Sequence, residues 1–488
     1  MKFVRYCTGY DIMILDFGIE YLSLLKGYNM ARKIAVILIL LLMMQAIPSL
    51  HVAASYDFRD LAARAAILVE KDSGVILFES DMHLRHPADG LAKIMTLLLA
   101  SYAVENDDVS DHELVKMTEQ AWVDMNNLST TQDIQPGEVM TFIDLMYSAY
   151  VGNANEACNM IAIRLGGSIE SFVAMMNRMA SDLGAENTRF TNPHGQYNVL
   201  QYTTAYDQYL IFSEAMKSSL FAEVASTFRH ITESNDETES RILTTSNALL
   251  NQNSRYYYRQ CIAGRDSATF EGGYSLVAFV EEEGLSLISV ILGSDVLMFE
   301  DESTDMRNYS ETIRMIQWGY SNFEWRDILK TTDLLARVPV LHGSGTDSVN
   351  VRPESSLSLL LNNAVSTESF IRQVIIFSDV NNEPLVAPIE AGAILGEVII
   401  TREGIQYARI YLVANTNVDL SGIEYIRGQV AALLATNTAR TILFVLIGLI
   451  VLYIVLVIRY NIVRANRLRR IKNAKEDIIR ERHQNLRE

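Results

Sequence analysis

The sequence has few cysteines and no surplus of basic charge. Its 488 residues include three cysteines, Cys7, Cys158 and Cys261, which are too few for a disulfide framework and show no metal-ligand spacing. We therefore expect no metal and no other cofactor. The net charge is -18, whereas a nucleic-acid-binding face needs an excess of Lys and Arg, so no nucleic-acid partner is expected. The sequence also has no internal repeat and no low-complexity segment.

The N-terminal part contains one segment with the order of a secretory signal peptide. A basic pair precedes an apolar run from 34 to 47, and small residues follow up to Ala54. This order predicts a signal peptide over residues 30–54, with cleavage near Ala54. Residues 1–29 show no such pattern and Met30 directly precedes the basic pair, so we interpret them as upstream translation. An uncleaved anchor with a long tail is the alternative.

A second apolar run lies near the C-terminus. Residues 441–458 carry no charge over 18 positions, which is long enough to cross a bilayer. The segment that follows, 459–488, has an excess of Arg and Lys, which predicts a cytoplasmic tail. The bulk of the protein, about 55–440, is therefore expected on the extracytoplasmic face of the cell membrane, tethered by a single transmembrane helix.

Between these ends the apolar patterns predict mixed helices and strands. Two apolar runs around turn residues 72–74 predict a hairpin, and a second hairpin is expected around the turn Glu281–Gly284. The segment Leu91–Ala103 is apolar on nearly every side, which predicts a core helix, and further helices follow as far as Met216. Helices in the middle with strands at both ends imply an α+β or α/β domain over residues 55–328.

From about residue 331 the pattern changes. Short strand-like runs alternate with Gly, Ser and Asn, and no helical period is visible before the membrane span. Residues 331–420 are therefore predicted to form a second, smaller β domain of the sandwich type. The segment His342–Ser348 holds a serine between glycines, but it lacks the strand-to-helix context of a catalytic Gly-x-Ser-x-Gly turn. We interpret it as a turn of the β domain.

The stretch RHPADGLAKIMTLLLA, Arg85–Ala100, opens the predicted core helix and carries one lysine, Lys93. A single lysine on an apolar helix is usually a surface residue. A lysine one turn after a serine, however, can take the proton of that serine if burial lowers the lysine pKa. Serine peptidases that recognise penicillin combine such a Ser-x-x-Lys helix with a Ser-x-Asn loop and a Lys-Thr-Gly strand.

At these residues the chain resembles the D-alanyl-D-alanine carboxypeptidases, the low-molecular-weight penicillin-binding proteins. The matching segments run in order through nearly the whole ectodomain: AAILVEKDSGVILFE, PADGLAKIMT, IQPGEVMTFIDLMYSAYVGNANEACNMIA, RFTNPHGQYNVLQYTTAYD, GGYSLVAFV and VAPIEAGAILGEVIITREG. The resemblance implies an α+β fold of the penicillin-binding and β-lactamase type, with a helical cluster on an antiparallel sheet. It also implies a small β domain before a C-terminal anchor, and peptidoglycan stem peptides as ligands.

The first family motif lacks its nucleophile. Lys93 and the Ile-Met-Thr after it are present, but Gly90 stands three residues before the lysine, where the family has serine. One extra residue lies between Pro87 and Lys93, so Asp89 can alternatively be aligned with the serine. Neither residue forms the usual acyl-serine ester, and loss of a nucleophile typically costs about 10⁶ in rate.

The other two motifs are also incomplete. The second reads Asn-Ala-Asn at 153–155, so Asn153 replaces its serine and Asn155 is retained. In the third, Arg265, Asp266 and Ser267 replace Lys-Thr-Gly. The arginine retains a cation that can hold a carboxylate in bidentate fashion, whereas Asp266 partly cancels that charge. The side chain of Ser267 is expected where the substrate backbone would lie.

These residues also have plainer interpretations. Asn155 can serve only to cap the helix that follows it, and Arg265 can simply pair with Asp266. His194, in the Asn-Pro-His-Gly turn, is expected to make a structural hydrogen bond and not to act in catalysis. Cys158, in a core helix, is expected to behave as a small hydrophobic residue.

Losses in three motifs predict a pseudoenzyme. In this interpretation the chain is a membrane-anchored carboxypeptidase-like protein that binds peptidoglycan stem peptides, or another cell-wall protein, without cleaving them. The alternative is an active serine-type carboxypeptidase or a hydrolase with relocated chemistry, for example a water activated by Lys93 or Asp89. Covalent labelling by a fluorescent penicillin separates the two.

Overall fold

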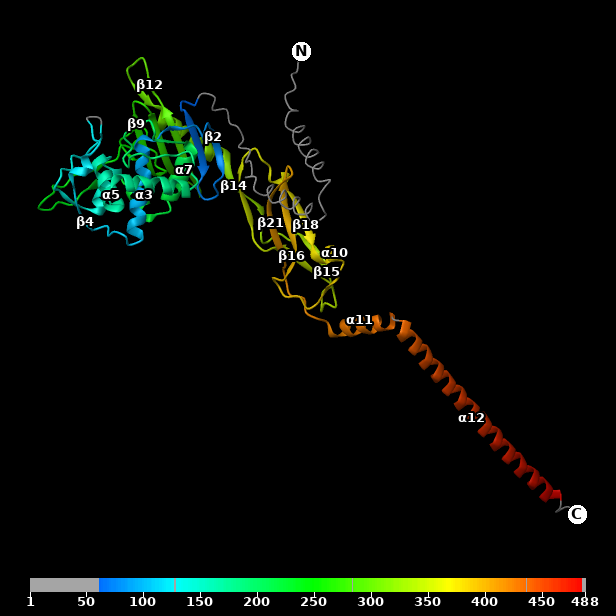
Figure 1. The fold of residues 1–488 in the computed structure, drawn as a ribbon. Helices are drawn as coiled ribbons and strands as arrows, with labels where there is room; N and C mark the ends of the chain where they lie inside the picture. The colour runs from blue at the N-terminus through cyan, green and yellow to red at the C-terminus, as the bar shows by residue number, and fades with distance from the viewer. Residues whose placement is uncertain (1–60, 127–128, 283, 436, 485–488) are drawn as a thin grey trace, which may run out of the picture. The chain divides into compact units, whose positions relative to one another are not determined.

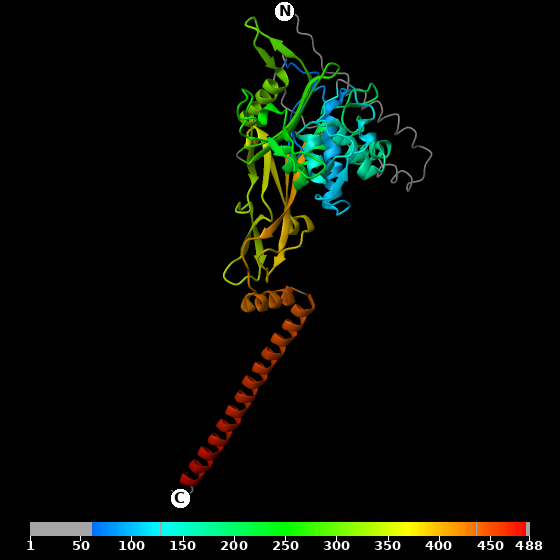
Figure 2. The same cartoon turned by 90° about the vertical axis from the view of Figure 1, so that its left-hand side faces the viewer.

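The computed structural model describes residues 61–484 except 127–128, 283 and 436. The expected signal peptide over 30–54 and the interpretation of residues 1–29 lie outside the described residues. The chain divides into two compact units between Phe323 and Glu324, slightly before the predicted end of the first domain. Each unit is considered by itself (Figures 1 and 2).

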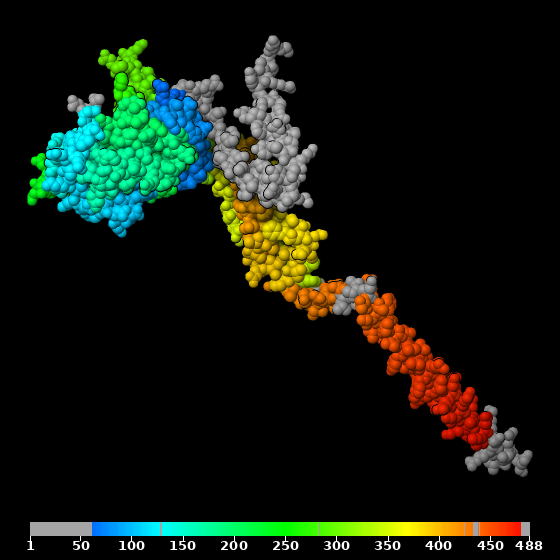
Figure 3. Space-filling view, in the orientation of Figure 1, coloured from blue at the N-terminus to red at the C-terminus, as the bar shows by residue number. Residues whose placement is uncertain are grey.

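The first unit is built on a five-stranded antiparallel sheet of order β2-β1-β11-β10-β9. Both predicted hairpins, β1–β2 and β10–β11, are present. Pairing of β1 with β11 joins the two ends of the unit, and Figure 3 shows the early blue segments packed beside later green ones. The strands are β1 (Ala65–Glu70), β2 (Ile76–Ser80), β9 (Cys261–Thr269), β10 (Gly273–Glu282) and β11 (Leu285–Ser294).

Helices cover both faces of this sheet. Because successive side chains on a strand point to opposite faces, Ile67 joins the core around α3 and α7, whereas Leu68 packs near Gly319 of α9. Ten of the fourteen residues of α3 are buried, which confirms the predicted core helix. The helices are α3 (Ala92–Glu105), α4 (Phe142–Tyr150), α5 (Asn155–Gly166), α6 (Ile169–Asp182), α7 (Ala205–Ala215), α8 (Ser219–Ser226) and α9 (Arg307–Asn322).

Short two-stranded ribbons tie the loops together. Pairing of β3 with β6 places the chain just before Gly90 beside the loop that contains His194. The ribbons are β3 (His86–Pro87) with β6 (Tyr202–Thr203), β4 (Leu114–Lys116) with β5 (Val139–Thr141), β7 (Arg229–Ile231) with β8 (Ile242–Thr244), and β12 (Val296–Met298) with β13 (Thr304–Met306).

The second unit contains the predicted β domain. Its main sheet has the order β18-β20-β21-β16-β15-β19, and its core includes Val338, Val351 and Val398. The predicted turn at His342–Ser348 links β15 to β16, which confirms that its serine does not belong to a strand-to-helix elbow. The strands are β14 (Phe323–Leu329), β15 (Ala336–Leu341), β16 (Ser348–Pro353), β17 (Leu357–Asn362), β18 (Ile371–Ile376), β19 (Leu385–Val386), β20 (Ile394–Arg402) and β21 (Ile405–Ala414).

Helices also occur in this unit where none was expected before the membrane span. A single turn, α10 (Phe377–Asn381), ends at Asn382 in the left-handed conformation. A longer helix, α11 (Gly422–Ala435), precedes α12 (Asn437–Gln484). Helix α12 contains the apolar run 441–458 and, among the described residues, is the one helix long and apolar enough to cross a membrane.

Candidate active site

A cavity of about 540 Å³ lies in the first unit where the three motif segments meet. It brings together residues from the start of α3, the start of α5 and strand β9. All seven predicted site residues line it: Gly90, Lys93, Asn153, Asn155, Arg265, Asp266 and Ser267.

Lys93 is buried at the cavity, with 2% of its surface exposed. Its Nζ donates hydrogen bonds to Asn155 Oδ1 at 2.7 Å and to the backbone oxygen of His194 at 2.6 Å. Burial lowers the pKa of Lys93 to about 8, and the charge of Arg265 acts in the same direction. The surface interpretation of this lysine is therefore wrong.

Gly90 lies one helical turn before Lys93, and the space beside it is occupied. It belongs to the short turn η2 (Asp89–Leu91), which leads directly into α3. The backbone nitrogen of Gly90 donates to Ser267 Oγ at 3.0 Å. A Cβ built on Gly90 would lie only 3.1 Å from that oxygen. The Ser267 hydroxyl of the third motif therefore contacts the backbone of Gly90, the residue that stands where the family motif has its serine.

The inserted residue, Asp89, is turned away from this position. Its backbone has a φ of 41°, and its Oδ2 accepts a hydrogen bond from Thr269 Oγ1 at 2.6 Å. Two glycines make room for it: a Cβ on Gly195 would lie 1.8 Å from the Asp89 backbone oxygen, and one on Gly272 would lie 1.9 Å from its Oδ2. Burial raises the pKa of this carboxyl. Asp89 is not among the described residues that line the cavity, whereas Gly90 is.

Arg265 binds groups of the second motif instead of its neighbour on the strand. Its Nη1 donates to the backbone oxygen of Tyr150 at 2.5 Å, and its Nη2 donates to Asn153 Oδ1. The guanidinium also lies 5.3 Å from the centre of the Tyr150 ring. Asp266 accepts from Ser246 Oγ at 2.6 Å, and both of these residues also line the cavity. The local ion pair between Arg265 and Asp266 is therefore not formed.

Asn155 does not act as a helix cap. The N-cap position of α5 is Ala154, and Asn155 is the first helical residue, with its side chain accepting from Lys93. Hydrogen bonds consequently link the three motifs in pairs: the first to the second, the first to the third, and the second to the third.

His194 makes the expected structural hydrogen bond, and Cys158 is buried in the core as expected. His194 Nδ1 accepts from the backbone nitrogen of Gln196 at 3.1 Å, and burial lowers the pKa of His194 to about 3, so its ring is neutral. Burial also raises the pKa of the Cys158 thiol to about 11, which keeps it from acting as a thiolate nucleophile.

The sequence model of one protein family, D-alanyl-D-alanine carboxypeptidase, matches residues 51–296, about half of the chain. The chain belongs to this family. Among curated relatives in the family, the carboxypeptidase DacF of Bacillus subtilis is 24% identical over 343 residues, which cover 70% of this chain and 82% of that protein. The carboxypeptidase DacC of Escherichia coli is 27% identical over 369 residues, which cover 74% and 85%.

Solved structures confirm the expected penicillin-binding-protein fold of this family member. Penicillin binding protein 5 from Haemophilus influenzae matches with a TM-score of 0.54 at 22% identity, over 74% of this chain and 98% of that one. A peptidoglycan synthesis regulatory factor, PBP3, from Streptococcus pneumoniae also has a TM-score of 0.54, at 20% identity, over 74% and 100%.

Several residues that line the cavity of this family member were not predicted. Ser129 Oγ donates to Gln196 Oε1 at 2.6 Å, so the loop before Pro136 meets the Asn-Pro-His-Gly loop at the rim. Phe270, at the turn between β9 and β10, is 99% exposed beside the opening. The hydroxyl-rich run Ser-Thr-Thr at 129–131 is a weak signal for the first of these loops, and Phe270 has no sequence signal at all.

Proposed function

We propose that this chain is a membrane-anchored, catalytically silent carboxypeptidase-like penicillin-binding protein of peptidoglycan metabolism. It binds stem peptides or another cell-wall protein and does not cleave them. Family membership supports the peptidoglycan setting, since the relatives are D-alanyl-D-alanine carboxypeptidases. Helix α12 supports the anchor, and the basic residues after 458 support a cytoplasmic tail with the two folded units on the other side.

One observation carries the proposal of silence: the residue that should present a hydroxyl to Lys93 is Gly90, and its backbone is hydrogen-bonded to Ser267. Acylation needs a nucleophilic oxygen at this point, and the general base alone does not form the covalent intermediate. A loss of about 10⁶ in rate is typical when the nucleophile is absent.

The residues that differ from the family motifs support retained binding, because they form hydrogen bonds with one another. Gly90 bonds to Ser267, and Asn153 bonds to Arg265, so changes in different motifs fit together. The cavity volume lies within the usual range for small-ligand sites, about 300–1,000 Å³. Arg265 Nε is buried and has no hydrogen-bond partner among the described residues. Arg265 lines the cavity, and its guanidinium supplies a positive charge that a peptide carboxylate would need.

The active-enzyme alternative draws support from one feature only. With its pKa near 8, the amine of Lys93 is partly unprotonated close to neutral pH and can accept a proton. Asp89 does not strengthen this alternative, since its side chain accepts a hydrogen bond from Thr269 and Asp89 does not itself line the cavity.

Fluorescent penicillin labelling tests the silence. The full chain in its membrane is incubated with the label beside an active relative such as DacC, and we expect a band for the relative and none for this chain. Lys93→Ala serves as the second sample. A band from the wild type that disappears in Lys93→Ala would overturn the proposal.

A titration tests the binding. A peptide ending in D-Ala-D-Ala is added to the full chain, with the same peptide amidated at its C-terminus as control. We expect saturable binding that weakens on amidation and in Arg265→Met, whereas Arg178→Met, at an exposed position of α6 outside the cavity lining, binds as the wild type does. No saturable signal would contradict stem-peptide binding and leave a wall protein as the ligand of the silent site.

A further inference from the structure

The mouth of the cavity in the first unit displays an aromatic side chain that the described chain leaves uncovered. Phe270, in the turn between β9 and β10, lines the cavity and is 99% exposed. Tyr197, which follows the Asn-Pro-His-Gly segment, lines the same cavity and is 44% exposed. Aromatic side chains supply much of the contact surface in ligand sites, and a phenylalanine is seldom left fully in water. Two aromatic side chains at one mouth therefore indicate a contact surface for part of a ligand.

The turn that carries Phe270 is held in place on both sides of this residue. Before it, Thr269 Oγ1 donates to Asp89 Oδ2 at 2.6 Å and accepts from the backbone nitrogen of Gly272 at 2.9 Å. After it, the backbone oxygen of Gly272 lies 2.7 Å from His86 Nε2, within hydrogen-bond distance. The ring is thus displayed by a fixed turn, so a ligand can cover it without first ordering the backbone.

Strand β9 sets the distance between Phe270 and the cation of the cavity. It is the last strand of the five-stranded sheet, so one of its edges has no strand partner in the described part of the chain. The consecutive residues Arg265–Glu271 all line the cavity, which therefore follows this strand and the turn after it. From Arg265 to Phe270 the path is about 17 Å at 3.3 Å per residue.

The full stem peptide of peptidoglycan has the length of this path. It is a pentapeptide with a carboxylate at one end and an amino sugar at the other, and such a chain spans at most about 17–18 Å when extended. An extended peptide can lie along an open strand edge. With its carboxylate at Arg265, its sugar end falls at Phe270. The carbon–hydrogen face of a sugar ring is apolar and has about the size of an aromatic ring, so the two can stack.

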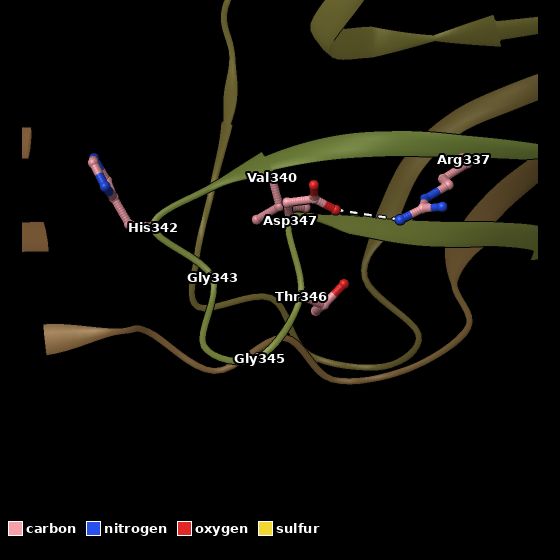
Figure 4. Close-up of a pocket in the computed structure, with 7 residues that line it drawn as sticks. All are labelled: Arg337, Val340, His342, Gly343, Gly345, Thr346 and Asp347. Atoms are coloured by element: carbon pink, nitrogen blue, oxygen red, sulfur yellow. Dashed lines mark hydrogen bonds and ion pairs between the residues drawn. The ribbon is translucent and has the colours of Figure 1, made fainter. Parts of the chain in front are cut away.

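The hollow in the second unit lacks this combination. The described residues that line it include no phenylalanine, tyrosine or tryptophan. Its arginine, Arg337, is paired with Asp347 at 3.2 Å, and Figure 4 shows these two side chains reaching toward each other. The charge of Arg337 is therefore neutralised by its neighbour, whereas Arg265 is bonded to neutral groups of Tyr150 and Asn153.

We propose that Phe270 binds the sugar to which the stem peptide is attached, with Tyr197 as a second aromatic contact at the same mouth. This inference rests on the proposed binding of stem peptides and narrows the ligand to the sugar-linked stem. Arg265 holds the carboxylate at the far end, so the site spans the whole stem and not only its terminal D-Ala-D-Ala.

Isothermal titration of the full chain in detergent tests the inference with two probes. One is a muramyl pentapeptide ending in D-Ala-D-Ala, and the other is the same pentapeptide with a lactoyl group alone in place of the muramyl group. We expect the wild type to bind the muramyl probe about tenfold more tightly, as partial burial of one aromatic side chain provides. Phe270→Ala should abolish this preference and leave the affinity for the lactoyl probe unchanged, whereas Phe270→Trp should keep the preference.

Phe299→Ala is the matched control, because it removes a phenylalanine that is 48% exposed and lies outside the cavity lining. It should bind both probes as the wild type does. The Phe270 ring is almost entirely exposed, so neither alanine variant should change Tm, which thermal unfolding checks.

The outcomes separate this inference from the proposed function. If the wild type binds both probes equally, or if Phe270→Ala keeps the preference or weakens both probes alike, stem-peptide binding stands and the sugar contact is wrong. If neither probe gives a saturable signal with the wild type, stem-peptide binding is itself wrong and the sugar contact is wrong with it.

Discussion

Replacing Gly90 by serine returns the missing hydroxyl to the first motif, and we expect it not to restore acylation. The added Cβ would lie 3.1 Å from Ser267 Oγ and 3.4 Å from Ser267 Cβ. The first distance is shorter than ordinary van der Waals contact, so Ser267 or the start of α3 has to move. The hydroxyl would then enter a site that is already filled.

The cost can be worked from these contacts. Overpacking of this kind costs about 1–3 kcal/mol, and weakening the 3.0 Å bond from the Gly90 nitrogen to Ser267 adds about 1 kcal/mol. For a unit of this size, each kcal/mol lowers Tm by roughly 2–4 °C. Ser267→Gly removes the side chain that the new Cβ would contact. The free energy of unfolding of the Gly90→Ser, Ser267→Gly double variant should therefore fall by about 1–2 kcal/mol less than the sum of the losses in the two single variants.

Thermal unfolding and penicillin labelling of the full chain measure both effects. Gly90→Ala is the matched control, since it adds the Cβ without the hydroxyl, and it should lower Tm as Gly90→Ser does. We expect no label on either, and slow labelling at most on the Gly90→Ser, Ser267→Gly double variant. If Gly90→Ser alone were as stable as the wild type and took up penicillin readily, the idea of a filled nucleophile site would be wrong.

Two further predictions concern the buried cations. The pKa of Lys93 is about 8 in the folded state and about 10.4 when unfolded, so the unfolded chain binds more protons between these values and the stability contribution of Lys93 rises with pH. Urea unfolding measures the free energy of unfolding of the wild type and of Lys93→Met. Between pH 7 and pH 10.5, this free energy should rise by up to about 3 kcal/mol more in the wild type than in the variant. A difference that stays constant with pH would show that Lys93 is not desolvated. Arg265→Met and Asn153→Ala should each cost about 1–3 kcal/mol, because each leaves a buried polar partner. The double variant should cost less than their sum, and strict additivity would contradict the contact.

Much of the fold follows from patterns that are local in the sequence. The core helix at Lys93 could be predicted because its apolar residues leave no polar side, and the two hairpins because turn residues separate apolar runs. Helix α11 was missed, because it buries no apolar face: Ile423, Ile426 and Val430 are exposed, and its contact with His342 is made at Gly428.

Only those residues of the site that belong to the family motifs could be predicted from the sequence. They indicated which residues gather at the cavity, but not how the substituted ones pair. Asn155 was open between cap and ligand contact, and Arg265 between Asp266 and a ligand; the structure gives them Lys93 and Asn153 as partners. Such pairings depend on contacts across about 60 to 110 residues, which local patterns do not encode.

The residue inserted at Asp89 would make the proposed loss of catalysis hard to reverse. Its backbone and carboxylate fill the room that Gly195 and Gly272 leave, so the start of the helix is held in a register one residue longer than that of the family motif. To regain the family spacing and its serine, one codon would have to be deleted and a second codon would have to be changed. Under the proposed silence, point mutation alone would not restore the motif, and the site could evolve under selection for other properties.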